Sequence, residues 1–111
     1  QDRKDRIFQS FIFSLSQNFR THHSVSFYAA EQCLTPRYFS TIVREKSGRN
    51  ALQWIMMFII AEAKKLLSDP DPSIKEIAET LGFSNQSFFG RYFKQYVGLS
   101  PMAFRSSGAE E

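Results

Sequence analysis

Two short stretches of the chain concentrate side chains that can hydrogen-bond to base edges or to phosphate. They run from Pro36 to Ser47 and from Asn85 to Val97. At the spacing of one helix face they carry Arg37, Ser40, Thr41 and Arg44 in the first stretch, and Gln86, Ser87, Gly90, Arg91 and Lys94 in the second. Arginine can pair with guanine, glutamine with adenine, and serine or threonine with either. Any single surface helix can look like this, but two such faces, almost without acidic residues, favour contact with duplex DNA.

The opposite sides of both stretches are apolar and predict where each helix packs. The expected core stripes are Tyr38, Phe39, Ile42 and Val43 in the first stretch, and Phe88, Phe89, Tyr92, Phe93, Tyr96 and Val97 in the second. Aromatic rings can instead stack on the bases of single strands, yet the helical spacing of these rings favours the core. Glu45, the one acidic residue in either stretch, is expected at the edge of the polar face.

Both stretches belong to a repeated pattern. Tyr28 to Thr35 matches Ile77 to Ser84 at an offset of 49 residues (28 and 77), and the offset grows to 50 at Gly48 and Gly98. Each copy pairs a small alanine, Ala29 or Ala78, with a cap residue six positions later. A short helix, a tight turn and a longer helix form a helix-turn-helix unit, and the alanine lets its two helices cross closely.

Helix signals recur along the whole chain, which predicts an all-α fold of about seven helices. Thr35-Pro36 is a helix start, Ser73 to Glu76 is a capping box, and Ser84 is expected to cap the helix after it. The expected helices are Arg6 to Phe19, Val25 to Gln32, Pro36 to Ser47, Ala51 to Leu67, Ile74 to Leu81, Asn85 to Val97, and a short one opened by Ser100-Pro101.

The stretch from Ala51 to Leu67 predicts a long, largely buried helix that joins the two units and places Trp54 in the core. Its 17 residues would span about 25 Å at 1.5 Å per residue. Such a helix could hold the two polar faces about one DNA turn apart, roughly 34 Å, so that they enter successive major grooves.

Gln32 is expected to face the core without a hydrogen-bond partner for its amide, which would make the first unit unfold more easily than the second.

The bulk composition fits one basic globular domain. The 111 residues are 42% hydrophobic with a net charge of +3, and the pI near 9.2 suits a nucleic-acid binder. A single cysteine, Cys33, forms no internal disulfide and indicates a reducing compartment. The charged start and the absence of a long apolar run predict neither a signal peptide nor a membrane span. Because the chain does not begin with Met, we expect a fragment of a longer protein, ending in a flexible tail at 106–111.

Metal binding and catalysis have weak candidates. His22, His23 and Cys33 lack the spacing of a zinc site, so we expect no metal: the histidines should touch phosphate or solvent and Cys33 should pack in its turn. The sequence has no glycine-rich phosphate loop, no nucleophile motif and no paired carboxylates in apolar surroundings. The chain is therefore predicted to be no enzyme and to need no cofactor.

The second repeat carries a long signature that resembles the AraC/XylS family of bacterial transcription regulators. It runs from Ser73 to Lys94, then through Gly98 to Pro101 and Phe104-Arg105, and the first unit matches more loosely over Leu34 to Ser40. The likeness covers about residues 22 to 105. By matching position, it implies base contacts from Arg37, Ser40, Thr41, Gln86, Ser87, Gly90 and Arg91, with Gly90 permitting close approach. Phosphate contacts are expected from Thr35, Arg44, Ser84, Asn85 and Lys94.

The resemblance also implies a domain plan and partners. Residues 1–21 would be an amphipathic helix following a sensor domain that is absent here, and 22–105 the DNA-binding domain. Within it lie the units at about 25–48 and 73–98 and the linker helix at about 51–67. Expected partners are double-stranded DNA, RNA polymerase, and an effector bound only by the sensor domain, with no membrane. A bacterial, cytoplasmic, nucleoid-associated regulator is the corresponding setting.

A second class of function stays open, in which one or both helix pairs dock RNA polymerase or a sensor domain. A docking face normally carries an aromatic or aliphatic anchor. Because the face around Gln86 and Arg91 is expected to be free of apolar residues, the sequence favours DNA binding.

Overall fold

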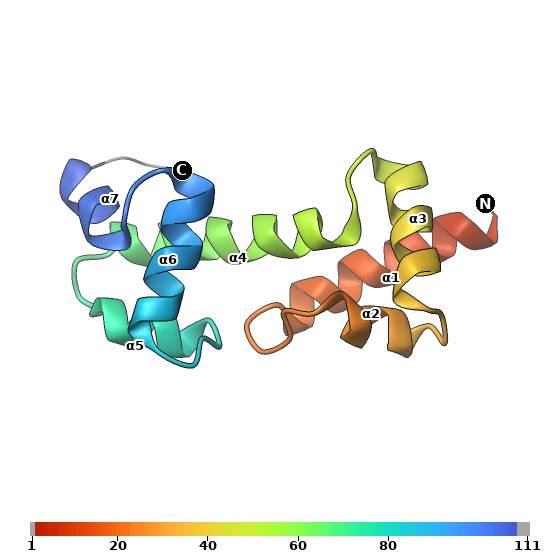
Figure 1. Ribbon diagram of the computed structural model, residues 1–111, viewed down its shortest axis with the longest axis horizontal. Coiled ribbons are helices and arrows are strands. Elements are labelled where there is room, and N and C mark those ends of the chain that lie inside the picture. The colour runs from red at the N-terminus through yellow and green to blue at the C-terminus, as the bar shows by residue number, and fades with distance from the viewer. Residues whose placement is uncertain (1, 109–111) are drawn as a thin grey trace. The chain divides into compact units, whose positions relative to one another are not determined.

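The structure is a computed structural model that describes residues 2–108, and every regular element in that range is a helix (Figure 1). The helices are α1 (Arg3–Asn18), α2 (Val25–Glu31), α3 (Pro36–Ser47), α4 (Ala51–Ser68), α5 (Ile74–Thr80), α6 (Gln86–Val97) and α7 (Pro101–Ser107). This confirms the predicted all-α fold of seven helices. The described residues form two compact units that divide between Phe58 and Ile59, so α4 contributes to both.

The first unit is built around the apolar stripe of α1. Phe11 is buried, and its ring meets the edges of Tyr28 on α2 and Phe39 on α3, with centroids 5.4 and 5.1 Å away. The Tyr28 hydroxyl donates a hydrogen bond to the backbone oxygen of His22 at 2.7 Å, so the buried phenol is satisfied. Burial raises the pKa of Tyr28 to about 12. The helix α1 is thus part of the packing of both α2 and α3.

Ion pairs add a second connection between α1 and α3. The Lys46 ammonium lies 2.8 Å from Asp5 and 3.6 Å from Asp2, and Lys4 lies 3.0 Å from Glu45. The hydrogen bond from Lys46 lowers the pKa of Asp5, and the same contact raises the pKa of Lys46. These five side chains, the α1–α3 ion-pair cluster, tie the start of α1 to the last turn of α3.

The second unit has its own aromatic core. Phe89 and Phe93 of α6 are fully buried, and Phe93 packs edge-to-face on Phe104 of α7 at 5.5 Å. Arg105 donates to the backbone oxygens of Leu67 and Asp69 at 3.1 and 2.9 Å. These carbonyls lie at the C-terminal end of α4, where helices leave acceptors unpaired, so Arg105 fastens α7 to that end.

The turns of the two units have the same backbone conformation. Leu34 donates from its backbone N–H to Ala29 at 3.0 Å, and Phe83 donates likewise to Ala78 at 2.9 Å. Cys33 is left-handed with a φ of 59°, at the position that Gly82 fills in the other unit with a φ of 81°. The prediction that Cys33 packs in its turn is wrong, because its side chain is exposed there.

The extra residue of the second unit lies at the start of α6. Asn85 caps this helix, its side-chain oxygen accepting from the N–H of Phe88 at 2.8 Å. Ser84 was the predicted cap, and that prediction is wrong. In the first unit Thr35 caps α3 directly, accepting from Tyr38 at 3.2 Å. The repeat offset therefore grows from 49 to 50 because Asn85 takes over the capping role that Thr35 alone has in the first unit.

Three aromatic residues predicted in the core are instead half-exposed. Tyr38, Phe88 and Tyr96 are 44, 47 and 44% exposed. Tyr38 and Phe88 each precede a fully buried phenylalanine by one residue, and a helix turns by about 100° per residue. This rotation puts both rings on the flank of the core stripe. Tyr96 lies in the last turn of α6, where its ring packs against Tyr92 at 5.1 Å.

Two polar contacts revise the expected packing around α2 and α4. The amide of Gln32 donates to the backbone oxygen of Ile7 at 3.0 Å, so the prediction of a buried amide without a partner is wrong. Trp54 is only partly buried, and its indole N–H donates to the hydroxyl of Ser47 at 2.8 Å. The first unit is therefore not weakened at Gln32 in the way that was expected.

The helix ends differ from the prediction by a few residues. Asp2 caps α1, which starts at Arg3 rather than Arg6, and α5 stops at Thr80. The capping box of Ser73 and Glu76 is confirmed. Residues 106 and 107 belong to α7, so that part of the predicted tail is helical, and residues 109–111 lie outside the described residues. No helix between residues 2 and 108 is long and apolar enough to cross a membrane.

Replacing Ala78 with Leu should destabilise the second unit. Ala78 is 1% exposed, and inserting methylenes into a packed core typically costs about 1–3 kcal/mol. Thermal unfolding followed by circular dichroism should show a lower melting temperature. Ala103→Leu is the matched control, because Ala103 is an exposed helical alanine. Equal melting temperatures for both variants would mean that α5 and α6 do not cross closely at Ala78.

Replacing Lys46 with Met should raise the pKa of Asp5 toward its ordinary value, because the hydrogen bond that stabilises its carboxylate is lost. A lowered carboxyl pKa stabilises the fold above the unfolded-state pKa, and this contribution disappears as the pH falls through the lowered value. In the Lys46→Met variant, this part of the loss of stability at low pH should be absent. Carboxyl chemical shifts followed by NMR across pH measure the change, with Lys75→Met as control. If the pKa of Asp5 is the same in Lys46→Met as in the unaltered chain, the ion-pair cluster is contradicted.

Candidate nucleic-acid interface

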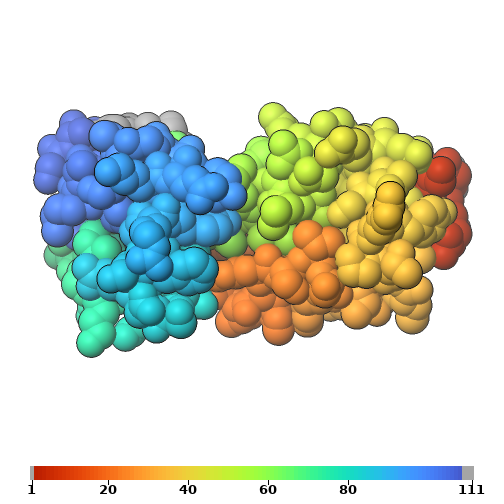
Figure 2. All heavy atoms as spheres, in the orientation of Figure 1, coloured from red at the N-terminus to blue at the C-terminus, as the bar shows by residue number. Residues whose placement is uncertain are grey.

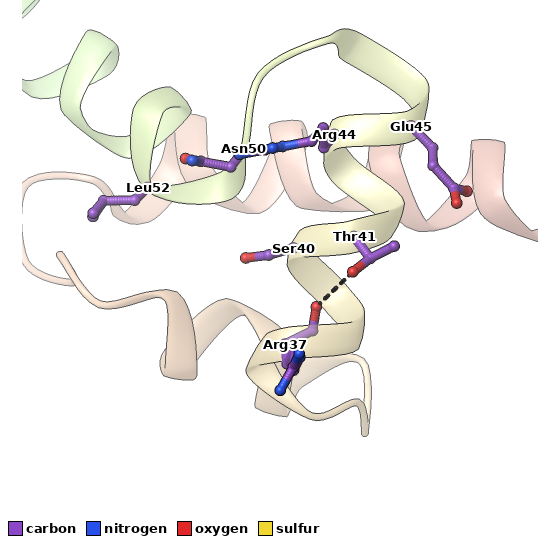
Figure 3. Close-up of a pocket in the computed structure, with 7 residues that line it drawn as sticks. All are labelled: Arg37, Ser40, Thr41, Arg44, Glu45, Asn50 and Leu52. Carbon is purple, nitrogen blue, oxygen red and sulfur yellow. Dashed lines mark hydrogen bonds between the residues drawn. The ribbon is translucent and has the colours of Figure 1, made fainter.

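The outward face of α3 lines an open hollow of about 420 Å³ together with the start of α4 (Figure 3). Arg37, Ser40, Thr41 and Arg44 come from α3, and Asn50 and Leu52 from the residues that begin α4. Figure 3 shows Ser40 and Arg44 projecting toward the Asn50 side. The Thr41 hydroxyl donates to the backbone oxygen of Arg37 at 3.1 Å, which leaves its oxygen lone pairs able to accept from a ligand.

Glu45 also borders this hollow, but its carboxylate is held by α1. Figure 3 shows its side chain projecting to the other side of α3 from Ser40, and Lys4 pairs with it at 3.0 Å. This agrees with its predicted place at the edge of the face. The positive charges of Arg37 and Arg44 are thus little offset by the one acidic residue of α3.

The outward face of α6 is polar and has no acidic residue of its own. Gln86, Ser87, Arg91 and Lys94 are exposed, and Gly90 is half-exposed between them. A methyl group built on Gly90 would meet no described atom within 4 Å apart from its chain neighbours and the backbone of its own helix. The glycine is therefore not required by the packing of this chain, which suits a position where an outside molecule approaches closely.

Two hollows flank this face of α6. One of about 370 Å³ is lined by Lys75, Ala78, Glu79, Ser84, Asn85, Gln86 and Ser87. The other, of about 260 Å³, is lined by Ile74, Gln86, Ser87, Gly90, Ser100, Pro101 and Met102. Gln86 and Ser87 border both hollows, so they lie at the centre of the candidate surface of the second unit.

The predicted site residues gather by unit. Figure 2 shows the atoms of α3 at the surface of the first unit and those of α6 at the surface of the second. The sequence prediction missed the residues that the following helix adds, namely Asn50, Leu52, Ser100 and Met102. The 50-residue repeat could have indicated them, because each pair occupies matching positions.

Two residues predicted to contact phosphate also cap helices, and one residue predicted in the core is exposed beside the polar face of α6. Thr35 and Asn85, expected at phosphate, use their side chains as helix caps. The half-exposed Phe88 means that the α6 surface is not free of apolar groups, so a missing apolar anchor no longer counts against protein docking.

His22 stacks on Phe27 with ring centroids 3.7 Å apart. Within residues 2–108, no group of three or more His, Cys, Asp or Glu could hold a metal.

Comparisons with known proteins identify relatives of this architecture. A family model described as a helix-turn-helix domain matches residues 28–107. The arabinose operon regulatory protein of Escherichia coli is 37% identical over 83 residues, which cover 75% of this chain and 28% of that protein. The corresponding protein of Salmonella typhimurium is 34% identical over 86 residues, covering 78% and 31%. The chain thus spans less than a third of the length of these relatives.

Solved structures agree in fold. The DNA-binding domain of AdpA, a global transcriptional factor in complex with a target DNA, is 25% identical with a TM-score of 0.78 and 90% of both chains covered. The C-terminal domain of AraT, a response regulator from Geobacillus stearothermophilus, reaches a TM-score of 0.85 at 23% identity, covering 96% of this chain and 88% of that one. The relatives are transcription regulators and not enzymes. The chain belongs to the AraC/XylS family of helix-turn-helix transcription regulators.

Proposed function

We propose that this chain binds double-stranded DNA in a sequence-specific manner through α3 and α6 and thereby regulates transcription. One observation carries the proposal: the same helix-turn-helix unit occurs twice, and each time its second helix exposes arginine and hydrogen-bonding side chains and borders an open hollow. A helix of about 10–12 Å diameter fits the major groove. Each unit therefore presents one recognition helix.

The residue types assign the contacts. Arginine forms paired hydrogen bonds with guanine, and glutamine forms them with adenine. The base-contacting residues are Arg37, Ser40 and Thr41 from α3, and Gln86, Ser87, Gly90 and Arg91 from α6. Thr35, Arg44, Ser84, Asn85 and Lys94 would contact phosphates, which fix the register of a protein on DNA. Thr35 and Asn85 can do so beside their capping role, through a hydroxyl proton or an amide N–H.

We infer a larger setting from the relatives. Because this chain spans less than a third of the arabinose operon regulators, residues 22–105 would be the DNA-binding part of a protein whose sensor domain binds an effector. Such a regulator would work at the nucleoid in the bacterial cytoplasm and would contact RNA polymerase from a promoter. The two units would then read successive major-groove segments.

A second candidate is favoured by the half-exposed rings of Tyr38 and Phe88. Aromatic rings are common anchors of protein interfaces, so α3 or α6 could dock RNA polymerase or the sensor domain. The positive charge of both faces and the DNA complex of the AdpA domain support DNA binding over this candidate.

Affinity for duplex DNA should fall steeply as salt rises, because bound cationic side chains release counterions from DNA. Arg44→Ala and Lys94→Ala should each make the slope of log K against log salt shallower by about one. Fluorescence anisotropy with a labelled duplex from binding-site selection measures this. Lys65→Ala, an exposed lysine of α4, should keep the slope of the unaltered chain. A flat salt dependence would contradict DNA binding and favour the docking candidate.

Both units should contribute to recognition, each in its own groove segment. Arg37→Ala and Gln86→Ala should weaken different parts of a methylation-interference footprint, about ten base pairs apart. The physical reason is that each side chain reads one base edge from a separate recognition helix. If Arg37→Ala changes neither affinity nor footprint while Gln86→Ala changes both, only the second unit reads DNA.

A further inference from the structure

The hollows beside α3 and α6 share a feature that the proposed contacts leave unexplained. Leu52 lines the hollow beside α3, and Met102 lines the one between α6 and α7. They lie 50 residues apart (52 and 102), at the same position of the repeat. Each is the second residue of the helix that follows a recognition helix.

Both side chains are apolar and largely uncovered. Leu52 is 53% exposed and Met102 is 57% exposed. A single exposed apolar residue is ordinary on a protein surface. Two of them at equivalent positions, each bordering a hollow with the candidate base-contacting residues, indicate a shared contact.

The neighbours of these residues narrow the kind of contact. Leu52 shares its hollow with Arg37 and Arg44, and Met102 shares its hollow with Gln86. The polar residues just before the two following helices, Asn50 and Ser100, use their side-chain oxygens within the protein. Asn50 accepts from the N–H of Gln53 at 2.8 Å, and Ser100 accepts from that of Ala103 at 3.1 Å. Leu52 and Met102 thus supply the apolar part of each hollow.

We propose that Leu52 and Met102 contact apolar groups of the DNA strand that lies in each hollow. This inference rests on the proposed function and adds two contact residues to it. Arg37 and Arg44 border the hollow of Leu52 (Figure 3), and their charge complements a phosphate backbone. The apolar groups that DNA offers beside a recognition helix are the thymine C5-methyl and the deoxyribose ring.

The test is binding of a labelled duplex, obtained by binding-site selection, to Leu52→Ala and Met102→Ala. Each substitution should weaken binding about four- to fifteenfold, as expected for the loss of one or two buried methylene groups. The salt slope should stay unchanged because no cation is removed. Phe13→Ala is the matched control, because Phe13 is 68% exposed on α1 and lines neither hollow. It should leave binding unaltered.

A second measurement changes only the DNA. Each thymine of the duplex is replaced in turn by deoxyuridine, which removes one methyl group. If one replacement weakens binding of the unaltered chain about fourfold, but not binding of Leu52→Ala or Met102→Ala, the partner is the thymine methyl. If the variants lose affinity equally on all these duplexes, the partner is deoxyribose. Both results support an apolar contact with DNA.

Other outcomes overturn the inference. If the unaltered chain binds the duplex and both variants bind equally well, Leu52 and Met102 do not touch DNA, and a protein partner becomes the better explanation of their exposure. Losses no larger than that of Phe13→Ala lead to the same conclusion. If the unaltered chain binds no selected duplex, the proposed function itself fails, which is a separate result.

Discussion

The recognition helices depend on a close helix crossing at Ala29 in the first unit and at Ala78 in the second. Both side chains are fully buried, and a larger side chain is expected to overpack the contact between the two helices at this point. The same alanines accept the backbone hydrogen bonds that close the turns, from Leu34 and Phe83. The helix contact and the hydrogen bond that closes the turn therefore meet at the same residue in each unit.

A further helix packs against each recognition helix, and the contacts it makes differ between the two units. In the first unit, α1 packs Phe11 on Phe39 and adds the α1–α3 ion-pair cluster. In the second, α7 packs Phe104 on Phe93, and Arg105 reaches the end of α4. The supports leave one face of each helix uncovered. That face carries the polar residues, so packing and recognition are divided between the two sides of the same helix.

Local signals in the sequence predicted much of the fold. Thr35-Pro36 and the capping box at Ser73 define helix starts through backbone hydrogen bonds between near neighbours, so they could be predicted without tertiary structure. Gly48 and Gly98 adopt left-handed conformations at the helix ends, with φ of 83° and 94°. These signals placed α3 and the start of α5 correctly.

Properties set by tertiary contacts were missed. Periodicity assigned Phe88 to the core, but the width of the core beneath α6 is set by α5 and α7. Gln32 was expected to lack a partner because its acceptor, the backbone of Ile7, lies 25 residues away. Leu52 and Met102 were missed for a similar reason, since their helices were not expected to border the polar faces. The base-contacting residues themselves were assigned from residue type and family likeness, and they stay predictions.

The central claim is that the uncovered faces of α3 and α6 both meet DNA. Amide chemical shifts of the isotopically labelled chain, recorded by NMR while a selected duplex is added, test it most directly. If both faces bind, the largest changes should fall at residues 35–44 and 84–94, with little change around Phe13 on the exposed side of α1. Changes that leave the amides of α3 and α6 unmoved and cluster elsewhere would contradict it.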